Sequence, residues 1–497
     1  MFTCRRKGLL AAACVAGLAS GLAATQASAE TLADAIALAY DSNPTLQAQR
    51  ATQRALDESV VQAKAGWRPT LNAQTYYYYR QYRSPGVAAI GQTFDTTKQD
   101  YAVLTLSQPV WTGGRVGAAV SAAEADVLQG RENLRRVEGQ VIASVIQAYV
   151  DVRRDQEALA IREENVKVLQ RQLEESKARF DVGEITRTDV AQSEARLAAS
   201  QALLRSAQAQ LAVSRASYAA VVGQNPGDLA PEPSLAPLLP DDVDKAFDVA
   251  EQNNAQIRAA EYAADATKAR VAEAKADHMP SVSVSGNLVW FTPASPFRTS
   301  DATREIVGQA TLTVPLYAGG LTSSRVRAQV ERDNAARIGI ETARRSVLQS
   351  VTQSWNQLLA ARANISSTAE QVKAAEIAAE GTRQEQQVGL RTTIDVLNAE
   401  QELRSAQLSQ VSAVHDEYVS SASVLLAMGR LEAANLTPAT ATYDPKTNFD
   451  KLRITWGWVP WEEPIGVADS AFTPKTKEMP REETVTLPAA DAAKPEQ

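Results

Sequence analysis

Apolar residues recur at helical spacing in two long proline-free stretches. In the first stretch they advance by three, four, three, seven and seven residues, at Ile142, Val145, Tyr149, Val152, Leu159 and Val166. The matching positions of the second stretch are Leu348, Val351, Trp355, Leu358, Ile365 and Val372. Steps of three and four form a narrow seam along a helix, as in a coiled coil. Proline costs about 3 kcal/mol inside a helix, so its absence from Val110 to Asn225 and from Leu316 to Thr437 favours long helices.

The first stretch predicts an antiparallel helical hairpin. Its first helix would run from about Gly114 to Phe180, roughly 100 Å at about 1.5 Å per residue, and stop at Asp181-Val182-Gly183-Glu184. Thr188-Asp189 supplies N-cap chemistry for a helix that returns to about Val222.

The second half repeats the first at a constant offset. Gln108-Pro109-Val110-Trp111-Thr112-Gly113-Gly114 returns as Val314-Pro315-Leu316-Tyr317-Ala318-Gly319-Gly320, an offset of 206 residues (315 − 109). The turn returns as Val388-Gly389, with Thr392 or Thr393 near the cap of a helix that reaches about Met428. So constant a period predicts two copies of one structural unit, each with a helical hairpin.

Before each long helix, the apolar residues change from helical spacing to every second position. The predicted strands are Arg68–Tyr79 and Tyr101–Gln108, joined by a loop with Pro85, Gly86 and Gly91, and Ser281–Trp290 and Ile306–Val314. Alternation of small polar and apolar residues over about ten positions is typical of a transmembrane β-strand, although a soluble hairpin alternates too. Either Leu104 and Leu106 or Val103 and Thr105 would face lipid, and the apolar pair is favoured.

Aromatic residues lie at or near the strand ends, where membrane-interface girdles belong. Trp111 and Tyr317 occupy equivalent positions just after the second strand of each half; the others are Trp67, Tyr76 to Tyr79, Trp290 and Phe291. Packing beneath a loop is the alternative interpretation. Four strands cannot close a barrel, because even small barrels need about eight, and an open sheet edge does not persist in lipid. Membrane-spanning strands would therefore require an oligomer.

Composition divides the rest of the chain. The expected units are a signal peptide (1–29), a first repeat (30–223), a Pro-rich linker (224–240), a second repeat (241–437), a C-terminal segment (438–463) and a disordered tail (464–497). Each repeat begins with one helix, from about Leu32 to Ala65 and from about Val243 to Ala276. Trp456, Trp458 and Trp461 are expected to pack, whereas the polar tail after Pro464 is expected to be disordered and dispensable.

The first residues have the pattern of a targeting segment. Arg5-Arg6-Lys7, an apolar run and Ala27-Ser28-Ala29 predict a secretory signal peptide cut before Glu30. Both cysteines, Cys4 and Cys14, lie inside it, so no thiol chemistry is expected; a lipid on Cys14 is the alternative, although the preceding residues match a lipobox poorly. Losing three basic residues takes the formal charge from −7 to −10, which disfavours nucleic acid as a partner.

Together, these features resemble the TolC family of outer-membrane efflux proteins, over about Glu30 to Leu436. The most specific stretch is Val388–Ala399, with its echo at Val182–Val190. The resemblance implies a mainly α fold with a membrane β-barrel, in which three protomers form a twelve-stranded barrel continued by an α-helical tunnel. It implies the exit duct of a type I secretion or tripartite efflux system in the outer membrane. The implied partners are a periplasmic adaptor and an inner-membrane transporter, ABC or proton-driven.

The resemblance also implies a gate at the periplasmic end, at Thr188, Asp189, Arg391 and Asp395. Arg391 would pair with Asp189 or hydrogen-bond near Thr188, and three Asp395 carboxylates would ring the lumen. Gln386 stands where the family has a tyrosine and Asn398 where it has a second aspartate. The acidic ring should therefore be single, and the lock weaker or differently wired. Alternatively, both aspartates are only helix N-terminal acids favoured by the helix dipole.

Two other classes of protein fit the sequence less well. A soluble periplasmic coiled-coil adaptor explains the helices but not the four strands. An enzyme is disfavoured, because His278 and His415 are the only histidines and lie in different elements without a metal-binding motif. No cofactor is expected. The chain also lacks a nucleotide-binding motif, so energy would come from a partner.

Overall fold

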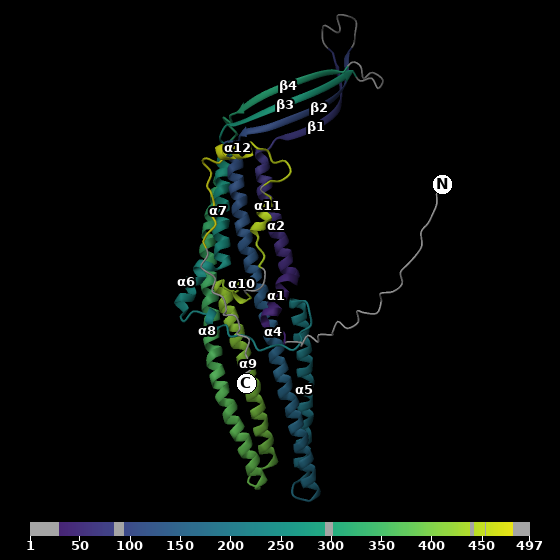
Figure 1. Cartoon of the computed structure of the whole chain (residues 1–497), viewed down its shortest axis with the longest axis vertical. Coiled ribbons are helices and arrows are strands. Elements are labelled where there is room, and N and C mark those ends of the chain that lie inside the picture. The colour runs from purple at the N-terminus through teal and green to yellow at the C-terminus, as the bar shows by residue number, and fades with distance from the viewer. Residues whose placement is uncertain (1–28, 84–93, 294–301, 438–441, 453, 481–497) are drawn as a thin grey trace, which may run out of the picture.

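The computed structural model describes residues 29–83, 94–293, 302–437, 442–452 and 454–480. A sheet lies at one end of a long helical bundle, and two helical hairpins end at the other (Figure 1). The predicted signal peptide, most of the loop with Pro85, Gly86 and Gly91, and residues 481–497 of the predicted tail lie outside the described residues. No helix in the described ranges is both long and apolar enough to cross a lipid bilayer.

The two repeats have the same order of elements. The first contains α1 (Leu32–Ser42), α2 (Pro44–Lys64), η1 (Ala65–Trp67), β1 (Thr70–Tyr82), β2 (Asp95–Trp111), α4 (Arg115–Asp181) and α5 (Arg187–Val222). The second contains α6 (Val243–Asn253), α7 (Ala255–Ala276), β3 (Ser281–Pro293), β4 (Thr303–Thr313), α8 (Leu321–Gln387) and α9 (Thr393–Met428). The long helices α4 and α8 both have 67 residues. These lengths confirm the predicted hairpins of roughly 100 Å.

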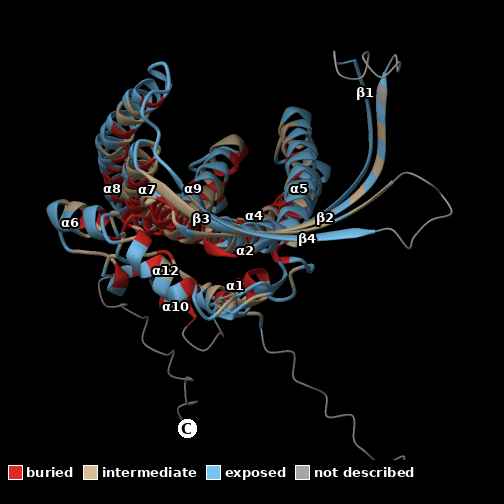
Figure 2. Ribbon diagram, turned by 90° about the horizontal axis from the view of Figure 1, so that it is seen from above, coloured by how far each residue is buried: buried red, intermediate tan, exposed pale blue. Residues whose placement is uncertain are grey.

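Short elements join and follow the repeats. They are η2 (Ala236–Leu238), α10 (Ala433–Leu436), α11 (Lys446–Lys451) and α12 (Glu462–Asp469). The core lies where the two hairpins meet the shorter helices, and its buried residues gather along the middle of the arc of helices (Figure 2). Tyr149 and Tyr218 are fully buried there. Their hydroxyls donate to the Ala230 carbonyl (2.6 Å) and to the Glu30 carboxylate (2.7 Å), which ties the linker and the N-terminal end to the bundle.

The single helices predicted at the start of each repeat are wrong, because each is broken by an asparagine. Asn43 and Asn254 have extended backbones and cap α2 and α7 through their side-chain oxygens. Their amide nitrogens donate to the carbonyls of Val221 (2.9 Å) and Ala427 (2.7 Å), in the last turns of α5 and α9. Each asparagine thus joins the end of one helix to the start of another. Pro44 favours the first break, since it disfavours helical geometry in the residue before it.

The C-terminal segment corrects two further expectations. Residues 464–480 are ordered and include most of α12, so the predicted disordered tail is wrong up to Pro480. Asp469 is buried beneath the sheet and accepts hydrogen bonds from Trp67 and from the start of α4. The expected packing of the tryptophans is wrong for Trp456, which is fully exposed. Buried polar anchors, together with the packing of Ile465 against Trp67, Val116 and Val120, hold this segment in place.

Candidate functional site

The sheet has one apolar and one polar face. Its four strands are antiparallel in the order β1-β2-β3-β4, and directly paired residues point to the same face. One face is mainly apolar and carries Leu71, Ala73, Ala102, Leu104, Leu106, Val284, Leu288, Trp290, Ile306, Ala310 and Leu312, with Thr75, Gln108 and Arg304 toward its ends. The other is mainly polar and carries Thr70, Asn72, Gln74, Thr105, Ser107, Ser283, Ser285, Asn287, Gln309 and Thr311, together with Val103, Val289 and Val307. The favoured pair, Leu104 and Leu106, therefore lies on the apolar face, and the four predicted strands are confirmed.

Aromatic residues bound the apolar face at both ends. Trp111 is the last residue of β2 rather than the residue after it, and a bulge beyond Pro109 pairs it with Val282 on the apolar face. Trp290 lies on the same face, eight residues further along β3 and so about 27 Å away at about 3.4 Å per residue. Membrane barrels carry an apolar band about 25 Å tall between two aromatic girdles. The apolar face has the dimensions of such a band.

Other aromatic residues are placed differently in the single chain. Tyr77 lies on the apolar face, one row beyond Trp290. Tyr76, Tyr101 and Phe291 form one cross-strand row on the polar face, with ring centroids 4.9 and 5.6 Å apart. Alternation forbids Tyr76 to Tyr79 from sharing one face. Trp67 is buried below the sheet, against Val116 and Val120. Tyr317 lies four residues beyond β4 and is 90% exposed.

The hairpin tips carry matching caps. The first cap is Thr186, not Thr188, because Thr186 has the extended backbone and Asp189 stands at the third helical position. Thr186 donates to the Asp189 carboxylate from its backbone nitrogen (3.0 Å) and its hydroxyl (2.7 Å). Thr392 does the same for Asp395, at 3.0 and 2.6 Å. These bonds hold the pKa of both aspartates below the ordinary value. Both acids are helix caps in this chain, and Thr188 is exposed within the first turn of α5.

Arg391 pairs within its own tip. Its guanidinium lies 2.8 Å from the Glu385 carboxylate, not near Asp189. The first tip has the reverse pair, Arg179 with Glu184 at 3.1 Å. Each pair closes the turn that follows a long helix. Gly183 and Gly389 give these turns their left-handed backbone, with φ of 81° and 79°.

The contact between the two hairpins near their tips comes from a residue that the sequence did not single out. Arg196 of α5 donates to the Asn398 side chain of α9 (2.8 Å) and to that of Gln401. A cavity of about 270 Å³ lies beside it, between α4, α5 and α9. On its wall, buried Glu400 pairs with Arg383 and lies 3.6 Å from Arg404. Asn398 thus accepts a hydrogen bond from the neighbouring hairpin.

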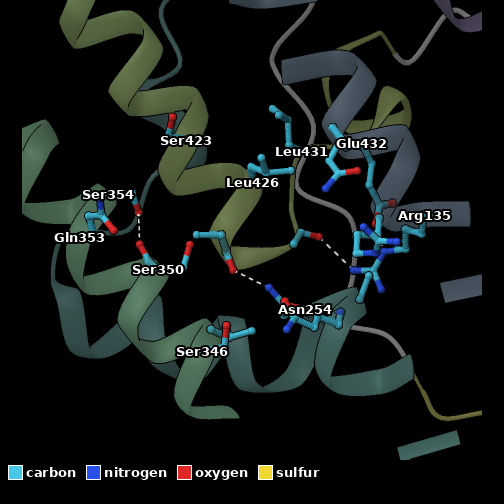
Figure 3. Close-up of a pocket in the computed structure, with 18 of the residues that line it drawn as sticks. Arg135, Asn254, Ser346, Ser350, Gln353, Ser354, Ser423, Leu426, Leu431 and Glu432 are labelled. Atoms are coloured by element: carbon cyan, nitrogen blue, oxygen red, sulfur yellow. Dashed lines mark hydrogen bonds and ion pairs between the residues drawn. The ribbon is translucent and has the colours of Figure 1, made fainter. Parts of the chain in front are cut away.

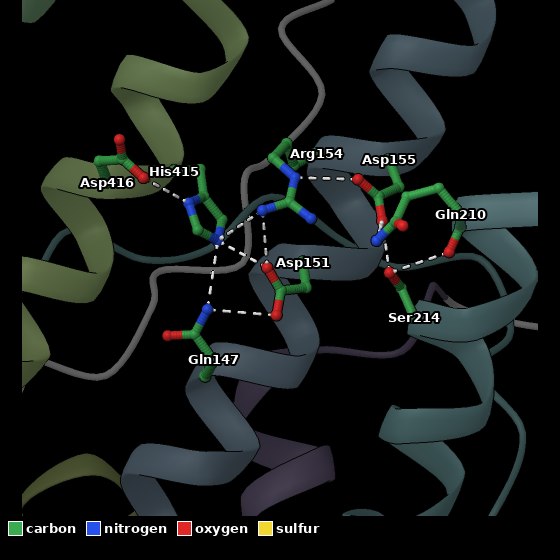
Figure 4. Close-up of polar contacts among 8 residues, drawn as sticks. All are labelled: Gln147, Asp151, Arg154, Asp155, Gln210, Ser214, His415 and Asp416. Carbon is green, nitrogen blue, oxygen red and sulfur yellow. Dashed lines mark hydrogen bonds and ion pairs between the residues drawn. The ribbon is translucent and has the colours of Figure 1, made fainter. Parts of the chain in front are cut away.

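A second polar bridge lies higher in the bundle (Figure 4). His415 of α9 lies 2.8 Å from Asp151 of α4 and 2.9 Å from Asp416. Burial lowers the pKa of His415, but the bonds to Asp151 and Asp416 outweigh it and raise the pKa above the ordinary value. Arg154 joins Asp151 to Asp155, which accepts from Ser214 of α5. His415 therefore holds helices of both hairpins together.

A cavity of about 420 Å³ opens where α7 begins and α9 ends (Figure 3). Arg135 of α4 reaches into this junction and donates to the carbonyls of Gly429 (2.9 Å) and Asn253. It also pairs with Glu132 (2.7 Å) and Glu432. Serine and glutamine side chains of α8 line the opposite wall. Arg135 completes the helix junction, and the described lining residues form no acid–base pair with a nucleophile.

Known proteins are similar to this chain in sequence and in fold. The family model described as outer membrane efflux protein matches residues 35–224 and 246–430. The chain is 33% identical to the outer membrane efflux protein BepC of Brucella suis biovar 1, over 90% of this chain and 96% of that protein. It is 24% identical to the alkaline protease secretion protein AprF of Pseudomonas aeruginosa, over 83% of this chain and 87% of that protein. The solved outer-membrane channel OprN superposes with a TM-score of 0.69 at 22% identity, over 80% of this chain and 89% of that chain.

Proposed function

The chain belongs to the outer membrane efflux protein family, and we propose that three copies of it form a continuous duct from the periplasm through the outer membrane. The family consists of outer-membrane channels, which are not a class of enzyme. Its members serve efflux and secretion, as the names of BepC and AprF state. The duct is thus the exit of a type I secretion or tripartite efflux system. A soluble adaptor would not need the two-faced sheet.

The two faces and the open edges of the sheet are the main support for this proposal. Its apolar face suits lipid, its polar face suits a water-filled lumen, and β1 and β4 are its edges in the described part of the chain. Three copies supply twelve strands and leave no edge. Energy comes from an inner-membrane transporter, ABC or proton-driven, reached through a periplasmic adaptor. Native mass spectrometry in detergent tests the assembly; a monomer that stays soluble without detergent would contradict it.

The internal repeat gives the register between copies. β1 maps to β3 with an offset of 211 (281 − 70), and β2 maps to β4 with an offset of 206. Applied to the pair Thr70↔Ser107, these offsets give Ser281↔Thr313, which is the pair found in the second hairpin. The repeat therefore preserves strand register. The pairing of β2 with β3 should then recur between β4 and β1 of the next copy.

This mapping places specific residues side by side. The pair Thr105↔Asn287 maps to Thr311 and Tyr76 of a second copy, which both belong to the polar face. The pair Trp111↔Val282 maps to Tyr317 and Leu71 of a second copy. β4 stops at Thr313 in the single chain, whereas β2 continues to Trp111 against β3. A second copy would extend β4 and bring Tyr317 to the apolar face as a girdle residue.

The packing of the long helices supports the same arrangement of neighbouring copies. α4 lies between α2 and α5 on one side and α7 and α9 on the other, whereas α8 has only α6, α7 and α9 beside it. As a result, Ile142 of α4 is 2% exposed, but its equivalent Leu348 of α8 is 49% exposed. An exposed large apolar residue in a position that the repeat buries marks an interface. α2 and α5 of the next copy would cover it.

Cysteine pairs test the register, because Cys4 and Cys14 are the only cysteines of the chain. The double variant Thr311→Cys/Tyr76→Cys should form a disulfide between copies under mild oxidation. The covalent product should have the mass of a trimer and revert with reductant. The control Thr311→Cys/Tyr78→Cys should stay unlinked, because diagonal neighbours lie about 7–8 Å apart, beyond the reach of a disulfide. Linking of the control pair alone would contradict the register but leave the trimer intact.

The periplasmic tips would form the gate. In the trimer, three Asp395 carboxylates would form one acidic ring, with Asp189, Thr188 and Arg391 around the same opening. Like charges in a narrow opening attract cations. The capping bonds from Thr392 keep Asp395 ionised, since they lower its pKa. Because Asn398 adds no second acidic ring, cation selectivity should depend on Asp395.

Arg196→Ala should loosen the closed tip. It removes the hydrogen bonds that join α5 to Asn398 and Gln401 of α9. Two such bonds contribute about 1–2 kcal/mol, so the open-to-closed ratio should rise about tenfold. Single-channel recording in planar bilayers measures this ratio. Arg205→Ala is the matched control, since Arg205 lies on the same helix and bonds only locally to Gln208. Equal gating in the two variants would remove Arg196 from the gate.

A further inference from the structure

The segment from Ile454 to Phe472, here called the collar, exposes an unusual amount of apolar surface. Its exposed large residues are Ile454 (69%), Trp456 (101%), Trp458 (37%), Trp461 (48%), Val467 (75%) and Phe472 (98%). Scattered exposed apolar residues are ordinary, but a group within one short segment marks a surface that binds something.

The inner side of the helix within the collar carries two buried acids, a glycine and Ile465, which packs against the apolar cluster of Trp67, Val116 and Val120. The buried residues of α12 are Glu462, Gly466 and Asp469, which share one side of the helix. Glu462 pairs with buried Arg68 at 2.8 Å. Gly466 lies against the Trp67 ring, where an added Cβ would come within 3.1 Å. Asp469 accepts from Trp67 and Thr112. These contacts fix the orientation of the helix.

The opposite side of the same segment is apolar. Its exposed residues are Glu463 at its start, followed by the apolar residues Pro464, Val467, Ala468, Ala471 and Phe472. They follow the spacing of one helical stripe, which Phe472 continues beyond the end of α12. A surface helix of a water-soluble protein has the reverse arrangement. An apolar outer side fits a neighbouring environment that is itself apolar.

The collar lies at the level where the apolar face of the sheet ends. α12 is directly below the sheet (Figure 1), and the indole nitrogen of Trp461 donates to the Gln108 side chain of β2 at 3.1 Å. Gln108 is three residues from Trp111, the lower girdle residue. In the view along the bundle, α12, α10 and α1 lie on the outer, convex side of the arc of long helices (Figure 2). The collar is therefore continuous with the lipid-facing side of the sheet.

We propose that the collar is a membrane-interface anchor, whose outer side lies in the headgroup region of the periplasmic leaflet of the outer membrane. Tryptophan is the side chain best suited to this zone, because its ring is apolar and its N–H is polar. The collar would hold the helical bundle at a fixed depth below the barrel. The proposal rests on the membrane orientation given by the proposed function.

Lipid-borne quenchers test the proposal. Single-cysteine variants of the chain from Glu30 onward, which lacks Cys4 and Cys14, are each labelled with a fluorophore and placed in phosphatidylethanolamine and phosphatidylglycerol vesicles with and without doxyl-labelled lipid. Val467→Cys and Phe472→Cys should be quenched. Val182→Cys is the matched control, because this valine is 72% exposed at the far tip of the first hairpin; it should not be quenched.

Leu106→Cys on the apolar face distinguishes failure of the proposed anchor from failure of the proposed membrane orientation. If Leu106→Cys is quenched and Val467→Cys behaves like Val182→Cys, the anchor is wrong and the duct stands. If Leu106→Cys is not quenched either, the membrane orientation itself is wrong. Disulfide linking of Val467→Cys between copies, without quenching, would assign the collar to a protein contact and overturn the proposal. The substituted side chains are exposed, and native mass spectrometry confirms that each variant assembles.

Discussion

Asp469→Ala is expected to lower the stability of the assembled protein by about 3 kcal/mol. The carboxylate accepts from the backbone nitrogens of Thr112 (2.8 Å), Gly114 (3.0 Å) and Gly117 (3.2 Å), and from the Thr112 hydroxyl and the Trp67 indole. It thereby caps α4, which begins after Gly114 with no side-chain cap of its own. Its removal leaves buried donors unsatisfied, at about 1–3 kcal/mol for a single group.

Thermal denaturation of the purified protein measures the effect, and limited proteolysis should show the collar released. The control is Asp34→Ala, since Asp34 is an exposed acid in the capping box of α1; it should cost about 1 kcal/mol. Burial raises the pKa of Asp469, but its hydrogen bonds outweigh burial and lower the pKa below the ordinary value. The contribution of the ionised carboxylate is therefore complete above the ordinary pKa of about 3.9 and is lost only as pH falls through the lowered value. Equal stability of the two variants would mean that the collar does not support α4.

Leu106→Arg is expected to prevent most of the protein from assembling in the membrane. Leu106 pairs with Leu71 and Gly286, in the row midway between Trp111 and Trp290 on the apolar face. A charge there should cost about 2–4 kcal/mol in each chain, and the cost falls toward the interfaces. Leu104→Arg should cost less, because Leu104 lies one row closer to the row of Trp290 and Arg304. The yield of trimer on gels of unheated samples measures the effect.

Ser107→Arg is the matched control for this variant. Ser107 is the next residue of the same strand and faces Thr70 and Ser285 on the polar face. An arginine there would extend into the lumen, so trimer yield should stay near that of the wild type. The reverse order of yields would show that the two faces of the sheet have been exchanged.

The sequence predicted those elements whose periodicity is strong. The two 67-residue helices follow from seams without proline, and the strands follow from alternation. The breaks at Asn43 and Asn254 were missed because the apolar spacing continues across them. Pro44 is a local signal for the first break, whereas the contacts of the two asparagines with α5 and α9 account for both breaks.

The order of residues 464–472 in the collar was missed for a different reason. Polarity and proline content predict disorder when polar groups have no partners, but Asp469 is satisfied by Trp67 and Thr112, which lie 402 and 357 positions away in the chain. The same limit applies to Arg196, which the sequence does not distinguish from other arginines of α5. The repeat predicts equivalent positions for the tip aspartates, and both stand third in their helices. Their role as helix caps is visible in one chain, whereas an acidic ring needs three.

Planar-bilayer recording of the purified wild-type protein tests the duct most directly. A detergent-extracted trimer should produce discrete current steps that prefer cations. This preference should be lost in Asp395→Ala and kept in Asp189→Ala. Protein that stays soluble without detergent and never produces current steps would contradict the proposed duct.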